Sequence, residues 1–198
     1  MSGLAAHPLT PARWKDLELL FGASGAYSNC WCAFQRVTGG EFSRGCANRG
    51  AGNRALLQGL TRDGRRPGLI GYRDGRPVGW VSAGPRREYG RILRSPVARL
   101  APAERDDPRV WAVVCFFVPR AERGGGVGRA LLEAAVDRAR RAGAARVEGY
   151  PVDTRGGLAQ SSSVFTGTLD LFERAGFVRV AEHVPGRPVV RLELAAVG

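Results

Sequence analysis

Apolar residues recur at intervals of three and four positions in four stretches of the chain, a spacing typical of helices that bury one face. In the first stretch Thr10 can cap a helix, Pro11 suits its first position, and Gly22 marks its end. In the third stretch Gly143 ends the helical pattern. The predicted helices span residues 11–21, 48–60, 127–141 and 164–175.

Short runs rich in aliphatic and aromatic residues lie between these stretches and are typical of strands. Asp74-Gly75 separates two of the runs and is a strong signal for a hairpin turn. The run from Val110 to Val118, which stops at Pro119, is apolar throughout. The predicted strands are residues 68–72, 77–81, 110–118, 145–150, 177–183 and 189–194, the last two forming a closing hairpin.

Length and composition favour a folded, water-soluble chain. With 198 residues and 44% hydrophobic content, the sequence predicts a single domain spanning residues 1–198 with a substantial core. No apolar run reaches the roughly 20 residues of a membrane span. The N-terminus lacks the basic start and apolar centre of a signal peptide, so we expect a cytoplasmic protein without membrane partners.

The formal charge of +12 raises the question of an acidic partner such as nucleic acid. Every basic residue except Lys15 is arginine, a bias that GC-rich codons alone can produce. The arginines are also scattered rather than gathered on one surface with aromatic residues. These features disfavour nucleic-acid binding, and part of the charge can serve the phosphates of a cofactor.

The four cysteines are Cys30, Cys32, Cys46 and Cys115. In a cytosolic protein we expect them to be reduced, and Cys115 lies in an apolar run that predicts a core position. The other three could offer thiolates to zinc, but no fourth cysteine or nearby histidine completes a usual ligand set. The sequence therefore predicts no metal site.

Three consecutive glycines separate the strand 110–118 from the helix 127–141. Glycine lets the backbone come close to a ligand, and the first N–H groups of a helix have no partner within it. These donors and the helix dipole together favour a phosphate at that end. The strand, turn and helix therefore predict a phosphate-binding loop.

The residues of this loop match a known pattern. Arg123, Gly126 and Gly128 fit R-x-x-G-x-G, and the loop resembles the pyrophosphate loop of the GNAT acetyltransferase superfamily. Residues 171–177 read LFERAGF and resemble that superfamily's L-Y-E-x-x-G-F helix end, with Phe172 in place of tyrosine. The two matches together span roughly residues 110–194, so the resemblance rests on more than one short motif.

The resemblance implies an α/β (α+β) fold with a mixed, mostly antiparallel sheet flanked by about four helices. It also implies transfer of an acetyl group from acetyl-CoA to an amine by direct attack in a ternary complex, without an acyl-enzyme. The strand end would bind the pantetheine arm and the thioester through Phe116, Phe117 and Val118. The loop residues that would bind the pyrophosphate are Arg123, Gly124, Gly125, Gly126, Val127, Gly128 and Arg129.

The catalytic acid and base do not carry over from the superfamily, because Phe172 has no proton to give to the departing thiolate. By rough position, Tyr150 is a substitute acid, with water or a serine among residues 161–163 as alternatives. Glu148, on the strand beside the expected cofactor channel, is the first candidate for the general base. Asp153 and Glu88 follow, and an ion-paired or solvated role for Glu148 stays open.

The acceptor pocket is expected between the first two helices, where Tyr27, Trp31 and Phe34 either line the pocket or fill the core. Residues 85–108 form either a cover over the acceptor entrance or a surface insertion. We expect a small-molecule amine as acceptor, and the basic surface disfavours strongly cationic ones. A homodimer stays open.

Two other classes of function compete with the enzyme. The first is a GNAT-like domain that binds acyl-CoA as a ligand but has lost catalysis, which Phe172 motivates. The second is a basic protein associated with nucleic acid, whose binding would weaken steeply with salt.

Overall fold

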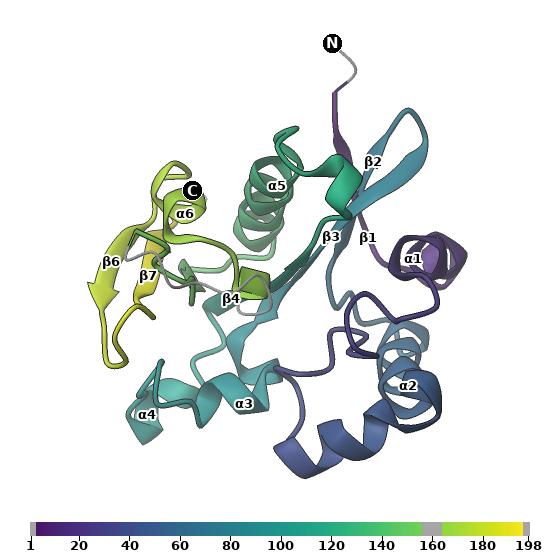
Figure 1. The fold of residues 1–198 in the computed structure, drawn as a ribbon. Helices are drawn as coiled ribbons and strands as arrows, with labels where there is room; N and C mark the ends of the chain where they lie inside the picture. Colours follow the sequence, from purple (N-terminus) through teal and green to yellow (C-terminus); the bar gives the residue numbers. More distant parts are fainter. Residues whose placement is uncertain (1–2, 156–163, 196–198) are drawn as a thin grey trace.

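The computed structural model of the protein describes residues 3–155 and 164–195 (Figure 1). Within these residues seven strands form one sheet in the order β1-β2-β3-β4-β5-β7-β6. The strands are β1 (Ala5–Pro8), β2 (Leu69–Arg73), β3 (Arg76–Pro85), β4 (Val110–Phe117), β5 (Arg146–Gly149), β6 (Val178–Ala181) and β7 (Val189–Glu193). Only β4 and β5 run parallel, which confirms the predicted mixed, mostly antiparallel sheet.

The helices include two that match their predicted bounds closely, α1 and α5. The helices are α1 (Trp14–Phe21), α2 (Gly39–Arg62), α3 (Gly90–Leu93), α4 (Pro102–Arg105), α5 (Val127–Arg141) and α6 (Leu169–Glu173), with 3-10 turns η1 (Pro11–Arg13), η2 (Arg86–Glu88), η3 (Arg120–Glu122) and η4 (Val164–Thr166). The predicted loop 85–108 therefore contains short helical turns. No helix among the described residues combines the length and hydropathy needed to cross a membrane.

Helix α2 begins at Gly39, well before the predicted start at residue 48. The reason is a capping box, in which the Glu41 carboxylate accepts a hydrogen bond from the Thr38 N–H at 2.8 Å and the Thr38 hydroxyl accepts one from the Glu41 N–H. The helix is kinked at residues 47–50, where four residues leave the helical conformation. The predicted helix thus corresponds to the second half of α2.

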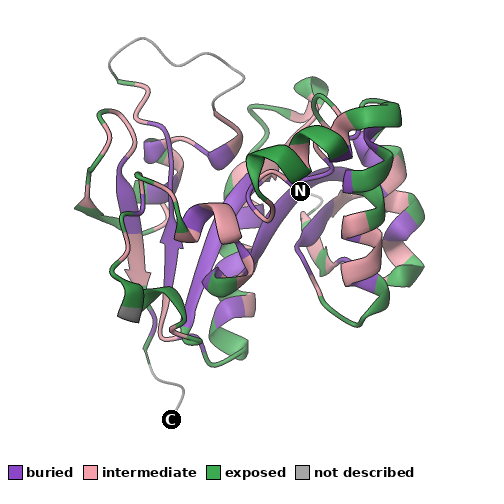
Figure 2. Cartoon of the chain, turned by 90° about the horizontal axis from the view of Figure 1, so that it is seen from below, coloured by how far each residue is buried: buried purple, intermediate pink, exposed green. Residues whose placement is uncertain are grey.

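The sheet is covered on both faces. Leu69 and Val81 belong to the cluster under α5 and α6, whereas their neighbours Ile70 and Trp80 belong to the cluster under α1 and α2. Successive strand residues point to opposite faces, so β2, β3, β4 and β7 each contribute to both clusters. In Figure 1, α5 and the α1–α2 pair lie on opposite sides of the sheet, and Figure 2 shows the central strands buried while the outer faces of the helices are exposed.

Strands β4 and β5 separate part of the way along their length. On one side β4 pairs with β3 as far as Phe117, which lies opposite Trp80. On the other side it pairs with β5 only as far as Val113, which lies opposite Gly149. Among the described residues, the last part of β4 therefore has no strand partner on the β5 side, and a gap opens there.

Candidate functional site

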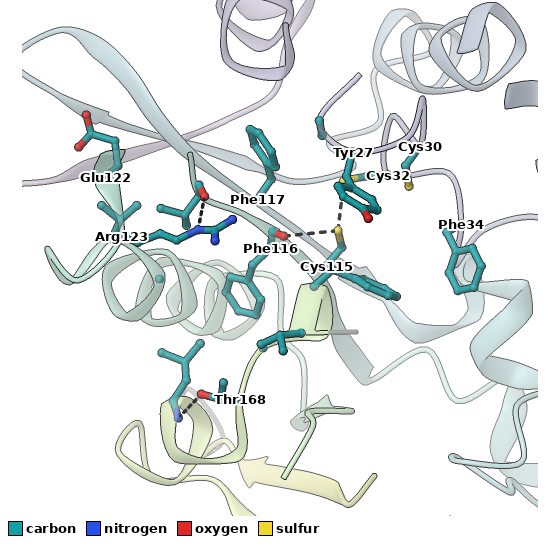
Figure 3. A pocket seen from close by; sticks show the side chains of 18 of the residues that line it. Tyr27, Cys30, Cys32, Phe34, Cys115, Phe116, Phe117, Glu122, Arg123 and Thr168 are labelled. Carbon is teal, nitrogen blue, oxygen red and sulfur yellow. Dashed lines mark hydrogen bonds between the residues drawn. The ribbon is translucent and has the colours of Figure 1, made fainter. Parts of the chain in front are cut away.

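A cavity of about 650 Å³ lies at the gap between β4 and β5 (Figure 3). Four segments and Phe42 of α2 line it. The segments are residues 26–34 between α1 and α2, residues 115–118 at the end of β4, the loop at residues 122–128, and residues 164–171 around η4 and α6. The predicted phosphate loop and the predicted pantetheine strand therefore meet in one cavity. Its surface is mainly apolar, with the glycine loop as a polar end.

The glycine loop is shaped by two residues in the left-handed region, Gly124 at φ +80° and Gly126 at φ +77°. A Cβ at either position would meet nothing within 4 Å, so the glycines are required by backbone conformation and not by crowding. Gly126 is the N-cap of α5, and the first N–H groups of that helix have no partner within it. Gly126, Val127 and Gly128 all line the cavity, which places the positive end of the helix dipole there.

Hydrogen bonds fix the loop to the strands on either side. Arg123 Nε donates to the carbonyl of Val118 at 3.0 Å, which ties the loop back to the end of β4 (Figure 3). From β2, Arg73 Nη1 forms an ion pair with Glu122 at 2.7 Å, and its Nη2 donates to the carbonyl of Gly125 at 3.2 Å. The role of Arg73 could not be predicted, because it lies about 50 residues before the loop in an unremarkable hairpin.

Close packing sets the position of the N-terminus of α5. A Cβ at Gly79 would lie 2.7 Å from Val127 and 2.9 Å from Leu131, so only glycine lets α5 approach β3 this closely. Two residues of the predicted loop, Gly125 and Arg129, are not part of the cavity lining. Arg129 is exposed and pairs with Glu133 at 2.8 Å.

Buried thiols line the apolar part of the cavity. The sulfur atoms of Cys32 and Cys115 lie 3.3 Å apart, and the hydrogen bond between them, together with burial, raises the pKa of Cys32 well above its usual value (Figure 3). Burial raises the pKa of Cys30 to about 12. These thiols stay protonated near neutral pH and are poor nucleophiles. The expected core position of Cys115 is confirmed by its burial, but it also lines the cavity.

The three predicted acceptor aromatics have different surroundings. Tyr27 and Phe34 line the cavity, and Tyr27 is 63% exposed at its rim. Trp31 is buried outside the lining, where it stacks on Trp14 with ring centroids 6.0 Å apart. Trp31 therefore belongs to the core, the second of the two interpretations that the sequence left open.

A second cavity of about 610 Å³ adjoins the first. The two cavities share Phe34 and Phe165, whose rings contact edge to face with their centroids 5.7 Å apart. The remaining lining comes from residues 35–39, residues 91–97, Tyr150 and Arg187. Part of the segment 85–108 thus borders this cavity, as expected if the segment lies at the acceptor entrance.

The proposed base Glu148 lies in neither cavity lining. It is 1% exposed on β5, and its carboxylate pairs with Arg86 at 2.8 Å and Arg191 at 2.9 Å. Tyr150 lines the second cavity and donates its hydroxyl to Glu148 at 3.0 Å. Burial and the nearby carboxylate raise the pKa of Tyr150 well above its usual value, so the phenol keeps its proton.

The secondary candidates for the base are also engaged in ion pairs. Asp153 binds Arg155 and Arg179, and the hydrogen bond from Arg155 holds the pKa of Asp153 at about 2. Glu88 pairs with Arg36 at 3.2 Å and with Arg65. The alternative serines at residues 161–163 lie outside the described residues.

Phe172, the departure from the superfamily motif, is a core residue. It is fully buried, and its ring contacts Phe116 and Phe177 edge to face. A Cβ at Gly149 would lie 2.3 Å from the Phe172 ring, so the glycine at the end of β5 makes room for it. Among the cavity-lining residues that sequence reasoning did not identify are Phe42, Phe165 and Thr168, which belong to no recognised motif.

The cysteines that could have offered a metal site are separated in the fold. Cys32 contacts Cys115, whereas Cys46 accepts a hydrogen bond from Asn53 Nδ2 at 3.4 Å. Within residues 3–155 and 164–195, no three His, Cys, Asp or Glu residues are grouped so that they could hold a metal ion.

Comparison with known families gives one match. The Acetyltransferase (GNAT) family matches residues 37–154, which is more than half of the chain. This range includes the glycine loop, β4 and β5. No curated protein matches the sequence significantly.

Solved structures with the same fold cover nearly the whole chain. The PaiA N-acetyltransferase of Thermoplasma acidophilum, in complex with coenzyme A, has a TM-score of 0.55 and 10% identity, covering 97% of this chain and 99% of its own. The ribosomal-protein-alanine N-acetyltransferase of Brucella melitensis has a TM-score of 0.53 and 19% identity, covering 96% and 99%. The yncA protein of Salmonella typhimurium, with its cofactor acetyl-CoA, has a TM-score of 0.54 and 16% identity, covering 96% and 94%. At these identities the likeness shows a shared fold.

Proposed function

This chain belongs to the GNAT acetyltransferase family, and on that premise we propose that it transfers the acetyl group of acetyl-CoA to the amine of a small molecule. The first cavity is the observation that carries the proposal. It joins the N-terminus of α5, the kind of helix end that favours a phosphate, to the part of β4 that has no β5 partner among the described residues, and it is large enough for the arm of a cofactor. Two of the structures that share the fold were solved with coenzyme A or acetyl-CoA.

The pyrophosphate of acetyl-CoA would bind at the loop from Arg123 to Arg129. The N–H groups around Gly126 supply the donors, and the absence of side chains at Gly124 and Gly126 leaves their approach open. Arg123 is held against the Val118 carbonyl, so its charge stays beside the loop. Arg129 is exposed one turn further along and would add long-range attraction only.

The thioester would lie at the end of β4, along Phe116, Phe117 and Val118. Among the described residues β4 has no β5 partner after Val113, so backbone groups of Phe116 and Phe117 on that side would bind the pantetheine arm and polarise the thioester carbonyl. A donor aimed at the developing oxyanion can lower a barrier by about 3 kcal/mol. The protein would thus use its backbone for this step, which fits a cavity with few polar side chains.

The acetyl group would pass directly to the amine, without an acyl-enzyme. The amine nitrogen would bond to the thioester carbon, the C–S bond would break, and coenzyme A would leave as a thiolate that takes its proton from water. The thiols of Cys30, Cys32 and Cys115 line the cavity, and their surroundings hold Cys30 and Cys32 protonated. A protonated thiol is a weak nucleophile, and no histidine lies in the cavity lining to activate it. Attack by the bound amine is therefore the simpler route.

We assign proton transfer at the amine to Tyr150 and Glu148 acting as one unit. The Tyr150 hydroxyl donates to Glu148, which leaves the oxygen lone pairs of the phenol as acceptors for an amine in the second cavity. Glu148 has no access to that cavity of its own, so it would act through Tyr150 as a positioning residue. Tyr27 and Phe34 would border the amine on the side of the first cavity.

The proposal is tested by calorimetric titration of the protein with acetyl-CoA, alongside the variant Gly126→Glu. The substitution places a negative charge where the pyrophosphate should bind, and we expect an affinity loss of at least about 100-fold. The matched control is Gly143→Glu at the opposite end of α5. Gly143 also has a positive φ, +74°, and open space around its Cβ. The two variants therefore introduce the same backbone strain and the same added charge. No acetyl-CoA binding by the folded natural protein would overturn the proposal.

A second candidate function is acyl-CoA binding without catalysis. Its support is the buried Phe172, which provides no proton where the family motif has tyrosine. Under this alternative, acetyl-CoA would bind normally, but no amine of a broad panel would be acetylated. Enzymatic release of coenzyme A in the presence of an amine distinguishes the two.

A further inference from the structure

The second cavity is positively charged. The described residues that line it include Arg91, Arg94 and Arg187 but no aspartate or glutamate. Glu41, on the first turn of α2 beside the lining residues Thr38 and Gly39, is bound to the Thr38 N–H and hydroxyl. The N-terminus of α2 adds the positive end of a helix dipole to this border.

Among the described residues, Arg91 and Arg187 have no carboxylate partner. The pKa of Glu41 is lowered by hydrogen bonds from Thr38 and also by the charge of Arg94, so Arg94 acts on a carboxylate. Arg91 lies over the ring of Phe34 at 4.1 Å and donates Nε to the Phe34 carbonyl at 2.6 Å, while its buried Nη2 has no partner. Arg187 donates only to the Tyr150 carbonyl, at 3.3 Å, and its Nε is buried without a partner. Burial alone lowers the pKa of Arg187, since no anion opposes it. Donors are thus left unused beside an open cavity.

For three other withdrawn arginines the protein itself supplies an anion. Arg36 pairs with Glu88, Arg73 with Glu122, and Arg86 with Glu148. Withdrawing a guanidinium from water without such a partner is unfavourable, and the cost falls when a ligand provides the missing oxygens. Guanidinium groups match carboxylate and phosphate geometry particularly well.

We propose that the second cavity binds the acceptor, and that the acceptor is an amine carrying an oxyanion group, a carboxylate or a phosphate, which Arg187, Arg91 and Arg94 bind. This rests on the proposed function, because it assigns the substrate class of the same enzyme. The oxyanion would lie among the arginines, while the amine lies toward the shared wall of Phe34 and Phe165, next to the first cavity. Diamines and polyamines would be excluded, because their second ammonium group would lie among the arginines without an anion to pair with.

The test is the rate of acetylation of matched amines that differ in charge. The pairs are glycine and glycinamide, L-phenylalanine and L-phenylalaninamide, γ-aminobutyrate and putrescine, and O-phosphoethanolamine and ethanolamine. We expect kcat/KM to favour the anionic member of at least one pair by 10-fold or more, the range of a charge-assisted hydrogen bond. The amine of an amide is less basic than that of the acid, so preference for the acid cannot arise from a larger deprotonated fraction. The last pair distinguishes phosphate from carboxylate.

The variant Arg187→Gln should bring that preference close to 1 while acetyl-CoA affinity stays unchanged. The matched control is Arg138→Gln, because Arg138 is also partly buried with its pKa lowered by burial, but it packs on Trp111 outside both cavities. It should keep the full preference. Equal rates within every pair, or faster acetylation of putrescine, would overturn the inference while leaving the acetyltransferase proposal intact.

If no amine of the panel is acetylated, the affinity of the protein for the same amines tests the inference instead. The same pairs are titrated into protein saturated with coenzyme A, and tighter binding of the anionic member that depends on Arg187 supports the inference. Equal binding, or binding insensitive to Arg187→Gln, overturns it. Failure of coenzyme A itself to bind is a separate result and removes the proposed function instead.

Discussion

Arg86 and Arg187 are both withdrawn from water, but the protein balances the charge of only one. Arg86 is 1% exposed and pairs with the equally buried Glu148 at 2.8 Å. Arg187 is partly buried at the edge of a cavity and has a backbone carbonyl as its partner. A buried charge needs either a permanent counter-charge or one that arrives with a ligand. The comparison therefore separates an arginine used to build the fold from one suited to binding.

The same comparison changes the interpretation of Glu148. A carboxylate beside a cofactor channel is a natural candidate for a general base, and the sequence supports that hypothesis. In the fold its oxygens are occupied by Arg86, Arg191 and Tyr150. Its contribution to chemistry must therefore pass through Tyr150, while its contribution to stability is direct.

The largest expected effect comes from removing the charge that balances Arg86. Glu148→Gln leaves Arg86 buried without an anion, and we expect the free energy of unfolding to fall by about 3–5 kcal/mol. Urea unfolding followed by circular dichroism measures this. The control is Glu133→Gln, which breaks the exposed pair with Arg129 and should cost only about 0.5 kcal/mol or less. Equal losses in the two variants would contradict the structural role of Glu148.

Tyr150 connects the buried ion cluster to the second cavity, and Tyr150→Phe should have an intermediate effect. We expect kcat to fall about 10- to 100-fold with acetyl-CoA affinity unchanged, because the amine loses its proton acceptor. Since burial and Glu148 raise the pKa of Tyr150, the phenol stays protonated below pH 10, and its ionisation should add no limb to the pH profile in that range.

A buried tyrosine outside both cavities provides the control for this variant. Tyr89 is fully buried, with its hydroxyl close to Ser82 and Arg36. Tyr89→Phe should lower stability by a similar amount, about 1 kcal/mol, without lowering kcat. If both variants lose the same activity, Tyr150 acts only through the fold.

The donor half of the site could be predicted from the sequence because it depends on backbone conformation. Gly124 and Gly126 adopt positive φ, and Gly126 caps α5, so the residue types themselves carry the signal. The first half of α2 was missed although Thr38 and Glu41 form a capping box, a signal that was present in the sequence. Strand β1 was missed because four residues at a sheet edge give almost no periodic pattern.

The arginines of the proposed acceptor site could not be predicted, because they meet only in the folded chain. Arg91 and Arg187 are nearly 100 residues apart, and nothing local distinguishes them from the many other arginines of this sequence. What distinguishes them is a missing carboxylate, which is a property of tertiary packing. The ion pairs of Glu148 could not be predicted for the same reason, because Arg86 directly follows β3 and Arg191 lies in β7.

The smallest expected effect tests the other side of the comparison. Arg187→Met removes a partly buried charge that lacks an anion, so the free energy of unfolding without ligand should change by less than about 1 kcal/mol, and a gain is as consistent as a loss. Arg86→Met is the contrasting variant, and it should be clearly destabilising because it removes the buried cation that pairs with Glu148. An anionic acceptor added at about 50 times its Kd should then stabilise the natural protein by about 2 kcal/mol. The same concentration should not stabilise Arg187→Met. A large loss of stability in ligand-free Arg187→Met would mean that Arg187 builds the fold, as Arg86 does, and the distinction between the two arginines would fail.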